Sequence, residues 1–257
     1  PPALATQIVE VSGRIDADGQ EVVPLQIPEV DLNAVDAVAI VLLNSHRNPA
    51  HEQAVAATID GPFISLGHQV SPELGYLGRI ETTLVDAAIT PLLDAALRRD
   101  AIDARDRAIR SDGSLCPAPA LRAPEAVLSG PAGGVLAVAA IAEAAGFDAA
   151  VGLDMGGTST DICRVDVHAL PHREDEARVA GVRIRRPMFE VETIAAGGGS
   201  ILASDGSRLR VGPESAGADP GPQCYGRGGP PTLTDAALAA GLIDPDAFDP
   251  PLDRDAI

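Results

Sequence analysis

The sequence predicts an α/β protein whose second half is rich in β-strands. Strand-like and helical segments alternate up to about residue 145, which is typical of a sheet covered by helices. After Gly146, short alternating strand patterns and glycine turns follow one another. Hydrophobic residues make up 46% of the chain and charged residues 22%, which is ordinary for a protein that folds around an apolar core.

The first half contains the clearest alternation of elements. Its predicted strands are 7–11 paired with 20–25 around the turn at 16–19, then 37–43, 64–66 and 108–110. Its predicted helices are 48–59, which opens with Pro49, and 82–99, which Pro91 is expected to kink. Turn residues 111–113 end this half.

A proline-rich stretch separates the two halves. It holds Pro117, Pro119 and Pro124 and precedes the glycine-rich segment 129–134. An alanine-rich helix then runs to about Ala145 and is stopped by Gly146. This combination predicts a domain junction.

The second half is expected to consist mainly of hairpins. The predicted strands are 149–154 paired with 160–165, then 189–194, and 201–203 paired with 208–211. Glycine and proline crowd 212–231, and a short helix capped by Thr or Asp is predicted over 234–243.

Charge and composition exclude several classes of function. The net charge is −18 and all 19 basic residues are arginine, so a polyanion such as nucleic acid is not an expected partner. The lack of lysine excludes a Walker A loop and a Schiff-base lysine. Three distant cysteines favour neither a disulfide framework nor a zinc site and fit the cytoplasm. No apolar run reaches the length of a membrane span.

The segment 153–162, LDMGGTSTDI, carries the strongest chemical signal. Gly156 and Gly157 allow backbone amides to bend around an anion and allow the anion to come close. Three hydroxyl residues follow: Thr158, Ser159 and Thr160. Two carboxylates, Asp154 and Asp161, flank the turn, and their natural task beside a phosphate is to hold hydrated Mg²⁺ or orient water. A glycine-rich hairpin without a ligand is the alternative.

A second glycine turn, Gly197–Gly198–Gly199, follows a predicted strand. Three glycines let a ligand or a second backbone come close, and a tight turn between strands is the alternative. In the later block, Glu214, Asp219, Cys224, Tyr225 and Arg227 sit in a loop whose length and composition are typical of functional or disordered loops. For Cys224 a packing role is favoured over a nucleophile, and for Asp235 a helix cap is favoured over a metal ligand.

Polar residues of the first half have weaker functional indications. For His46, His51 and Glu52 structural capping is favoured over metal binding, because the predicted strand end and helix start need not bring them together. For His68 and Glu73 a position facing a substrate stays open. Arg110, with Ser111 and Asp112 beside it, follows a predicted strand; a carboxylate clamp and a surface ion pair are both open.

Several separate blocks resemble the hydantoinase A / 5-oxoprolinase family, and their order and spacing agree with that family. The blocks are LLNSHRNPAHE (42–52), GRIETTLVDAAITP (78–91), RSDGSL (110–115), LSGPAGGV (128–135), LDMGGTSTD (153–161), TIAAGGGSI (193–201) and VGPESAGADPGPQCYGRGGPPTLTDA (211–236). The glycine turn also resembles the second phosphate motif of the actin, hexokinase and heat-shock-chaperone ATPases.

The resemblance implies a fold and a domain division. It implies two ribonuclease-H-like lobes of the actin-like ATPase kind, both incomplete: the first over 1–125, a linking helix over 126–147, and the start of the second over 148–257. Family members carry a further Asp-Gly-Gly-Thr turn and a later glycine-rich adenosine segment. Neither is found here, the chain lacks a starting Met, and we therefore expect an internal piece of a longer protein that is inactive alone.

The resemblance also implies an activity. We expect part of an ATP-dependent, Mg²⁺-using hydrolase that phosphorylates the carbonyl of a cyclic amide, 5-oxoproline or a hydantoin, before hydrolysis. Asp154 and Asp161 are the expected catalytic residues, with Asp154 also at the metal; Gly156 to Thr160 and Gly197 to Gly199 are expected at the nucleotide. A hydantoinase B-type partner and an oligomer are implied. An acetone-carboxylase-type subunit and a nucleotide-gated binding module are the alternatives.

Overall fold

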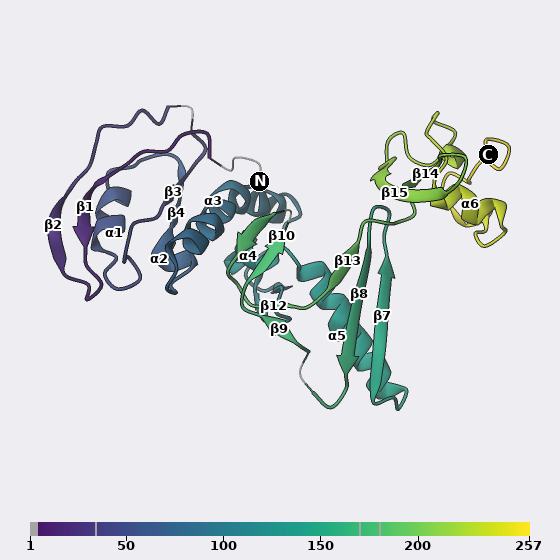
Figure 1. The fold of residues 1–257 in the computed structure, drawn as a ribbon, viewed down its shortest axis with the longest axis horizontal. Helices are drawn as coiled ribbons and strands as arrows, with labels where there is room; N and C mark the ends of the chain where they lie inside the picture. Colours follow the sequence, from purple (N-terminus) through teal and green to yellow (C-terminus); the bar gives the residue numbers. More distant parts are fainter. Residues whose placement is uncertain (1–4, 34, 170, 180) are drawn as a thin grey trace. The chain divides into compact units, whose positions relative to one another are not determined.

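The chain forms two units in a computed structural model that describes residues 5–33, 35–169, 171–179 and 181–257. Unit 1 comprises residues 1–133 and 172–189, and unit 2 comprises residues 134–171 and 190–257. The predicted division into 1–125, 126–147 and 148–257 is contiguous, whereas the segment 172–189 returns to unit 1. The mixed α/β class is confirmed, and Figure 1 shows the elements of each unit.

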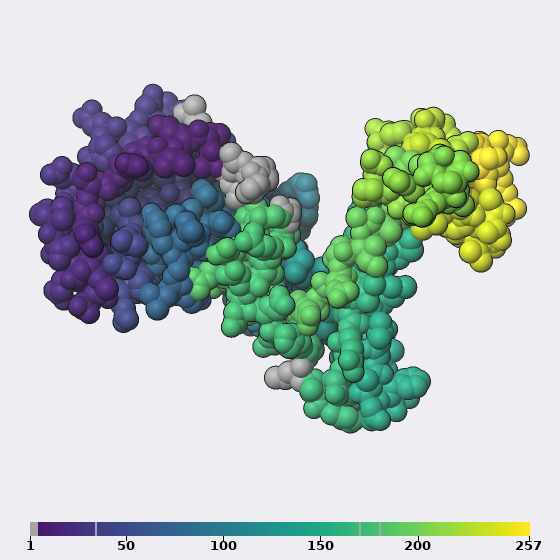
Figure 2. Space-filling model, in the orientation of Figure 1, coloured from purple at the N-terminus to yellow at the C-terminus, as the bar shows by residue number. Residues whose placement is uncertain are grey.

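Unit 1 begins with an antiparallel hairpin and a parallel strand–helix–strand motif. The hairpin consists of β1 (Ser12–Ile15) and β2 (Glu21–Gln26). The motif consists of β3 (Ala37–Ile40), α1 (Ala50–Ala56) and β4 (Phe63–Leu66). The predicted pairing of the hairpin is confirmed, although its first strand lies at 12–15 and not at 7–11. In Figure 2 the purple atoms of this hairpin lie beside the blue atoms of the strand–helix–strand motif.

A long helix forms the centre of unit 1. After the short α2 (Gly67–Val70), α3 runs over Tyr76–Arg99 and contains Pro91. It begins six residues before the predicted start at Thr82, behind Gly75, which provides no side-chain cap. The remaining elements before the junction are β5 (Arg107–Ile109), β6 (Leu115–Pro117), the 3₁₀ turn η1 (Ala118–Ala120) and α4 (Ala123–Ala126).

The segment 172–189 supplies strands that the sequence pattern did not predict. They are β9 (Arg173–Glu174), β10 (Ala177–Val179), β11 (Val182–Ile184) and β12 (Met188–Phe189), paired as β10–β11 and β9–β12. Val182, Ile184 and Met188 form a buried cluster with Val85 of α3. The predicted strand 189–194 is therefore wrong as one element, because Phe189 pairs in unit 1 and Glu192–Ile194 pairs in unit 2.

Unit 2 is built around a three-stranded antiparallel sheet with the order β13–β8–β7. Helix α5 (Ser129–Ala144) leads into β7 (Ala149–Met155), β8 (Thr160–Asp166) and β13 (Glu192–Ile194). A hairpin and short helices complete it: β14 (Ser200–Ser204), β15 (Leu209–Ser215), η2 (Gln223–Tyr225), α6 (Leu233–Ala239) and η3 (Pro245–Ala247). The predicted pairs 149–154 with 160–165 and 201–203 with 208–211 are confirmed.

The stretch Ala123–Ala144, which contains α4 and α5, is more apolar than the sequence analysis allowed. Its 22 residues have a mean hydropathy of 1.6 in an 18-residue window, of which 17% is buried. The prediction that no apolar run reaches the length of a membrane span is therefore wrong, because this stretch is long enough and apolar enough to cross a membrane. The core helices of water-soluble proteins pass the same test, so this property alone assigns no membrane.

Candidate functional site

The predicted phosphate turn connects β7 to β8. The two strands pair in register, so that Asp154 lies opposite Asp161 and Met155 lies opposite Thr160. Directly opposed residues of an antiparallel pair project from the same face of the sheet. The hairpin therefore places both predicted carboxylates on one face, immediately before and after the turn.

Backbone amides at the tip of this turn are available to an anion. The amide of Gly156 donates to the carbonyl of Ser159 at 2.8 Å, which closes the turn. Within the described residues, no protein acceptor is recorded for the amides of Gly157, Thr158 and Ser159. Successive amides without an acceptor form the kind of concavity that holds phosphate oxygens. The local geometry is thus compatible with the predicted role of the turn.

The second glycine turn packs directly on the first one. The amide of Gly198 donates to the carbonyl of Gly156 at 2.9 Å, and the amide of Gly199 donates to the carbonyl of Gly157 at 2.6 Å. A β-carbon at Gly197 would lie 2.6 Å from the carbonyl oxygen of Gly156. At Gly197 and Gly199 the lack of a side chain therefore lets a second backbone come close, as one of the interpretations of the sequence expected. Their predicted contact with the nucleotide stays a prediction.

Two of the predicted polar side chains are already bonded within the protein. The hydroxyl of Thr160 is buried and donates to the carbonyl of Ala196 at 2.6 Å. Thr193 of β13 donates its hydroxyl to Asp161 at 2.7 Å. Thr160 and Asp161 therefore hold the hairpin to the neighbouring strand. The side chain of Asp154 is exposed and has no hydrogen bond or ion pair with other described residues.

The carboxylates fit Mg²⁺ only if other ligands complete its coordination. No group of three or more His, Cys, Asp or Glu side chains that could hold a metal occurs among the described residues. Mg²⁺ commonly binds through one or two carboxylates, with waters and substrate phosphates supplying the other oxygens. Asp154 and Asp161 beside a phosphate turn are compatible with that arrangement, in which the nucleotide brings the missing ligands.

Cys224 and Asp235 form a buried structural pair in unit 2. The Cys224 side chain is fully buried, and its backbone amide donates to Asp235 at 2.7 Å. Burial, followed by the hydrogen bond with Asp235, raises the pKa of the Cys224 thiol to about 12. Asp235 also accepts from the amide of Thr232 at 2.6 Å in the capping box of α6. The predicted cap is confirmed, and a thiol in this state is no nucleophile.

The polar residues that follow β3 in unit 1 have separate partners. His51 Nε2 lies 2.7 Å from Glu21, and Glu52 lies 2.6 Å from His68 Nδ1. His46 Nδ1 lies 3.2 Å from a guanidinium nitrogen of Arg79. These contacts agree with the structural roles favoured for His46, His51 and Glu52, because each of the three side chains contacts a different partner.

Arg110, Ser111 and Glu73, for which the sequence left a functional role open, have partners within unit 1. Arg110 pairs with Glu125 at 3.2 Å, which matches the ion pair and not the carboxylate clamp. Ser111 is fully buried, and its hydroxyl donates to the carbonyl of Glu125. Glu73 accepts from the hydroxyl of Ser71 at 2.9 Å.

The sequence analysis missed Arg79, which is only 1% exposed. Its guanidinium donates to the carbonyl of Leu42 at 3.1 Å and lies over the ring of Tyr76 at 6.0 Å. Burial lowers the pKa of Arg79. Its position as a lone arginine among small and hydroxyl residues on one face of α3 is the signal that could have identified it.

Models of one protein family match almost the whole chain. The hydantoinase/oxoprolinase model matches residues 79–256, and the model of the hydantoinase/oxoprolinase N-terminal region matches residues 1–61. Caprolactamase subunit alpha of Pseudomonas jessenii is 39% identical over 259 residues, which cover 91% of this chain and 36% of that protein. The 5-oxoprolinase of Saccharomyces cerevisiae is 37% identical over 226 residues, which cover 84% of this chain and 18% of that protein.

Two solved structures resemble the chain. The ATP-dependent caprolactamase from Pseudomonas jessenii gives a TM-score of 0.67 at 37% identity, over 91% of this chain and 37% of that one. A nucleotide-free acetone carboxylase gives a TM-score of 0.79 at 22% identity, over 96% of this chain and 38% of that one. At that identity the acetone carboxylase shows the fold alone. The chain thus spans about a third of the length of the caprolactamase subunit and less than a fifth of the yeast enzyme.

Proposed function

Because this chain belongs to the hydantoinase/oxoprolinase family, we propose that it is part of an ATP-dependent hydrolase that opens a small cyclic amide. The names of its relatives support this proposal, since they include an ATP-dependent caprolactamase and several 5-oxoprolinases. The observation that carries it is the turn between β7 and β8, where three successive amides have no acceptor among the residues that the structure describes.

The chemistry explains why such a hydrolase uses ATP. Resonance makes the carbonyl of a lactam a poor electrophile, so water attacks it slowly. Transfer of the γ-phosphoryl group of ATP to the carbonyl oxygen releases ADP and creates a good leaving group. A first water adds to the carbon, and the ring C–N bond breaks to give an amine and an acyl phosphate. A second water then attacks the acyl phosphate, which yields the carboxylate and inorganic phosphate. Positioning and charge neutralisation dominate catalysis of the phosphoryl step.

Each part of the hairpin has a proposed task in that reaction. The amides of Gly157, Thr158 and Ser159 bind phosphate oxygens. Asp154 would hold a hydrated Mg²⁺, which would supply neutralisation of the phosphate charge. Asp161, held by Thr193, supports the metal shell or the turn itself. Asp154 is the residue proposed to act at the reacting groups, since it is exposed beside the free amides.

The wider assembly follows from the same proposal. We infer that the two units belong to two ribonuclease-H-like lobes of an actin-like ATPase and that ATP binds with Mg²⁺. A second subunit or domain of hydantoinase B type completes the hydrolase, in an oligomer located in the cytoplasm. The designation of the caprolactamase relative as subunit alpha supports a multi-subunit enzyme.

Phosphate release tests the proposal in the whole protein that carries this sequence. ATP turnover is measured with 5-oxoproline, with a hydantoin, and with acetone plus bicarbonate. Stimulation by a cyclic amide is the expected result. Stimulation by acetone and bicarbonate alone would replace the proposal with a carboxylase. Slow turnover that no small molecule changes would replace it with a nucleotide-gated binding module.

A further inference from the structure

The segment 172–189, which we call the strap, connects two strands of unit 2 and yet belongs to unit 1. It follows β8 in the chain and precedes β13. Both strands lie in the sheet that carries the phosphate turn, and β8 begins directly after that turn. Because the chain is continuous, the strands beside the turn are joined through the strap to unit 1.

The strap packs along one face of α3. Gly78, Thr82 and Val85 share that face, because residues three and four positions apart lie on the same side of a helix. The amide of Arg185 in the strap donates to the hydroxyl of Thr82 at 3.0 Å. Val85 is buried in the cluster that it forms with apolar side chains of the strap. Hydrogen bonding and apolar burial together therefore hold the strap on the helix.

The side chain of Arg185 reaches the residues that precede α3. One guanidinium nitrogen donates to the carbonyl of Leu74 and, at 3.3 Å, to that of Gly75, the residue before the helix. There is room for this side chain because residue 78 is a glycine, where an added β-carbon would overlap the Cδ atom of Arg185. Arg185 is thus the strap residue that contacts the start of α3.

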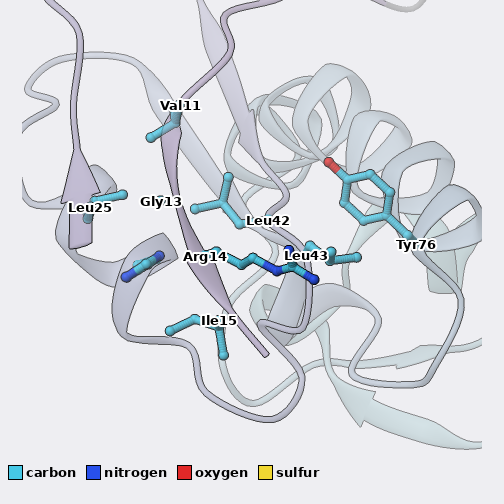
Figure 3. A pocket seen from close by; sticks show the side chains of 9 residues that line it. Val11, Gly13, Arg14, Ile15, Leu25, Leu42, Leu43 and Tyr76 are labelled. Carbon is cyan, nitrogen blue, oxygen red and sulfur yellow. The ribbon is translucent and has the colours of Figure 1, made fainter. Parts of the chain in front are cut away.

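The start of α3 forms one side of a hollow in unit 1. Tyr76, the first residue of the helix, lines this hollow of about 480 Å³ together with Arg14 of β1 and Leu42. Figure 3 shows Tyr76 on one side of the hollow and Leu25 on the other. A movement of the first turn of α3 therefore changes the shape of the hollow.

At its other end the strap is joined closely to the strand beside the phosphate turn. Its last residue, Phe189, is fixed in unit 1, where its amide donates to the carbonyl of Ser111 at 2.9 Å. The connection 190–191 then leads to β13 and spans at most roughly 10 Å. Thr193 of β13 donates to Asp161 at 2.7 Å, directly after the turn. A displacement of β13 is therefore transmitted to the strap.

We propose that the strap couples occupancy of the phosphate turn in unit 2 to the first turn of α3, and so to the hollow in unit 1. Arg185 is the positioning residue of this coupling. The docked strap holds β13 where the turn accepts phosphate, so strap docking and nucleotide binding favour each other. Such an effect between two sites is reciprocal. The nucleotide rests on the proposed function, whereas the coupling rests on the contacts of the strap.

Calorimetric titration of the whole protein that carries this sequence tests one direction of the coupling. The probe is the non-hydrolysable ATP analogue AMP-PNP with Mg²⁺. Arg185→Ala should weaken AMP-PNP binding at least about fivefold, the lower end of typical coupling between two sites. Gly78→Ala should act in the same way, because the added β-carbon displaces Arg185 while alanine favours a helix more than glycine does.

A matched control separates this effect from a general loss of charge in the strap. Arg178→Ala removes an exposed arginine of β10 and should leave the affinity for AMP-PNP unchanged. Thermal unfolding of each variant verifies that it is folded. An equal loss of affinity in Arg178→Ala and Arg185→Ala would overturn the role of Arg185.

Hydrogen exchange measured by mass spectrometry tests the other direction. In the wild-type protein AMP-PNP should slow amide exchange in the turn, 153–162, and also in the start of α3, 76–82, there about fivefold or more. In Arg185→Ala, saturating AMP-PNP should still protect 153–162, but exchange in 76–82 should no longer respond. A purely structural role of Arg185 would lower stability without removing this response to the nucleotide.

The outcomes separate the coupling from the proposed function. Protection of 153–162 with no response of 76–82 in the wild-type protein would overturn the coupling and leave the proposed function intact. An unchanged affinity for AMP-PNP in both Arg185→Ala and Gly78→Ala would overturn the coupling as well. Failure of AMP-PNP to protect 153–162 would instead refute the phosphate role of the turn, and with it the coupling.

Discussion

The backbone of Gly197 lies directly against that of Gly156: a β-carbon added to Gly197 would stand 2.6 Å from the carbonyl oxygen of Gly156. The same added carbon would lie 2.7 Å from the amide nitrogen of Thr158. The two glycine turns are therefore one structural unit, and the second turn sets the position of the carbonyls of the first. The amides of Gly157, Thr158 and Ser159 have no acceptor among the described residues, as the proposed phosphate contact requires.

A methyl group at Gly197 should break this packing. We expect Gly197→Ala to destabilise unit 2 by about 1–3 kcal/mol, the usual cost of forcing an extra carbon into packed surroundings. Chemical denaturation provides the measurement. Gly157→Ala is the matched control, because its added carbon meets nothing within 4 Å. Equal stability of the two variants would contradict the close packing of the turns.

Removal of the charge at Asp154 should stop the chemistry without unfolding the protein. We expect Asp154→Asn to lower ATP turnover by the whole protein at least about a hundredfold, the scale typical of a lost electrostatic contact at a reacting group. The side chain is exposed, so the melting temperature should not change. Asp166→Asn, on the adjacent strand β8, serves as the control. Near-normal turnover in Asp154→Asn would remove this residue from the proposed reaction.

Local sequence patterns predicted the β7–β8 hairpin well. Each of the two strand segments is apolar or alternates apolar and polar residues. Between them, Gly156–Gly157 marks a single possible position for the turn. The register that sets Asp154 against Asp161 follows from the short connection between the strands. The capping box of α6 is equally local, since Thr232 and Asp235 are three residues apart. Such features need only neighbouring residues to specify them.

The segment 172–189 could not be predicted in the same way. Its strands are two or three residues long and rich in charge. Ile184 and Met188 become buried only against Val85, about a hundred positions earlier in the chain. The hollow beside Arg14 likewise depends on the β1–β2 hairpin, the loop after β3 and the start of α3 coming together. A sequence window does not contain these long-range contacts.

Cys224 should resist alkylation in the folded protein. Its thiol has a pKa of about 12, raised by burial and by Asp235, and the thiolate is the reactive form. With iodoacetamide at pH 8, mass spectrometry should find Cys224 unmodified in the native chain and modified after denaturation. Cys163, which is partly exposed, should react sooner. Rapid native labelling of Cys224 would contradict its structural role.

The buried carboxylate of Asp86 should make unit 1 sensitive to acid. Asp86 is 0% exposed and accepts hydrogen bonds from Ser65, Thr90 and Arg122. Burial opposes its ionisation, but these bonds outweigh burial and lower the pKa of Asp86 from its ordinary value of 3.8. The unfolded chain therefore takes up the proton first as the pH falls. The stabilisation is complete above about pH 5 and is lost as the pH drops through the folded-state pKa.

Asp86→Asn tests this assignment. It leaves Arg122 without its partner, and we expect the free energy of unfolding at pH 7 to fall by about 3 kcal/mol, the lower end for a broken buried pair, because the Arg122 side chain is 40% exposed and can reach water. The variant should also lose part of the acid sensitivity between pH 5 and pH 3 in denaturation experiments. Asp60→Asn, at an exposed position of the same unit, should change neither quantity. An Asp86→Asn protein as stable as the wild type at pH 7 would show that the buried pair does not hold α3 against the proline-rich stretch.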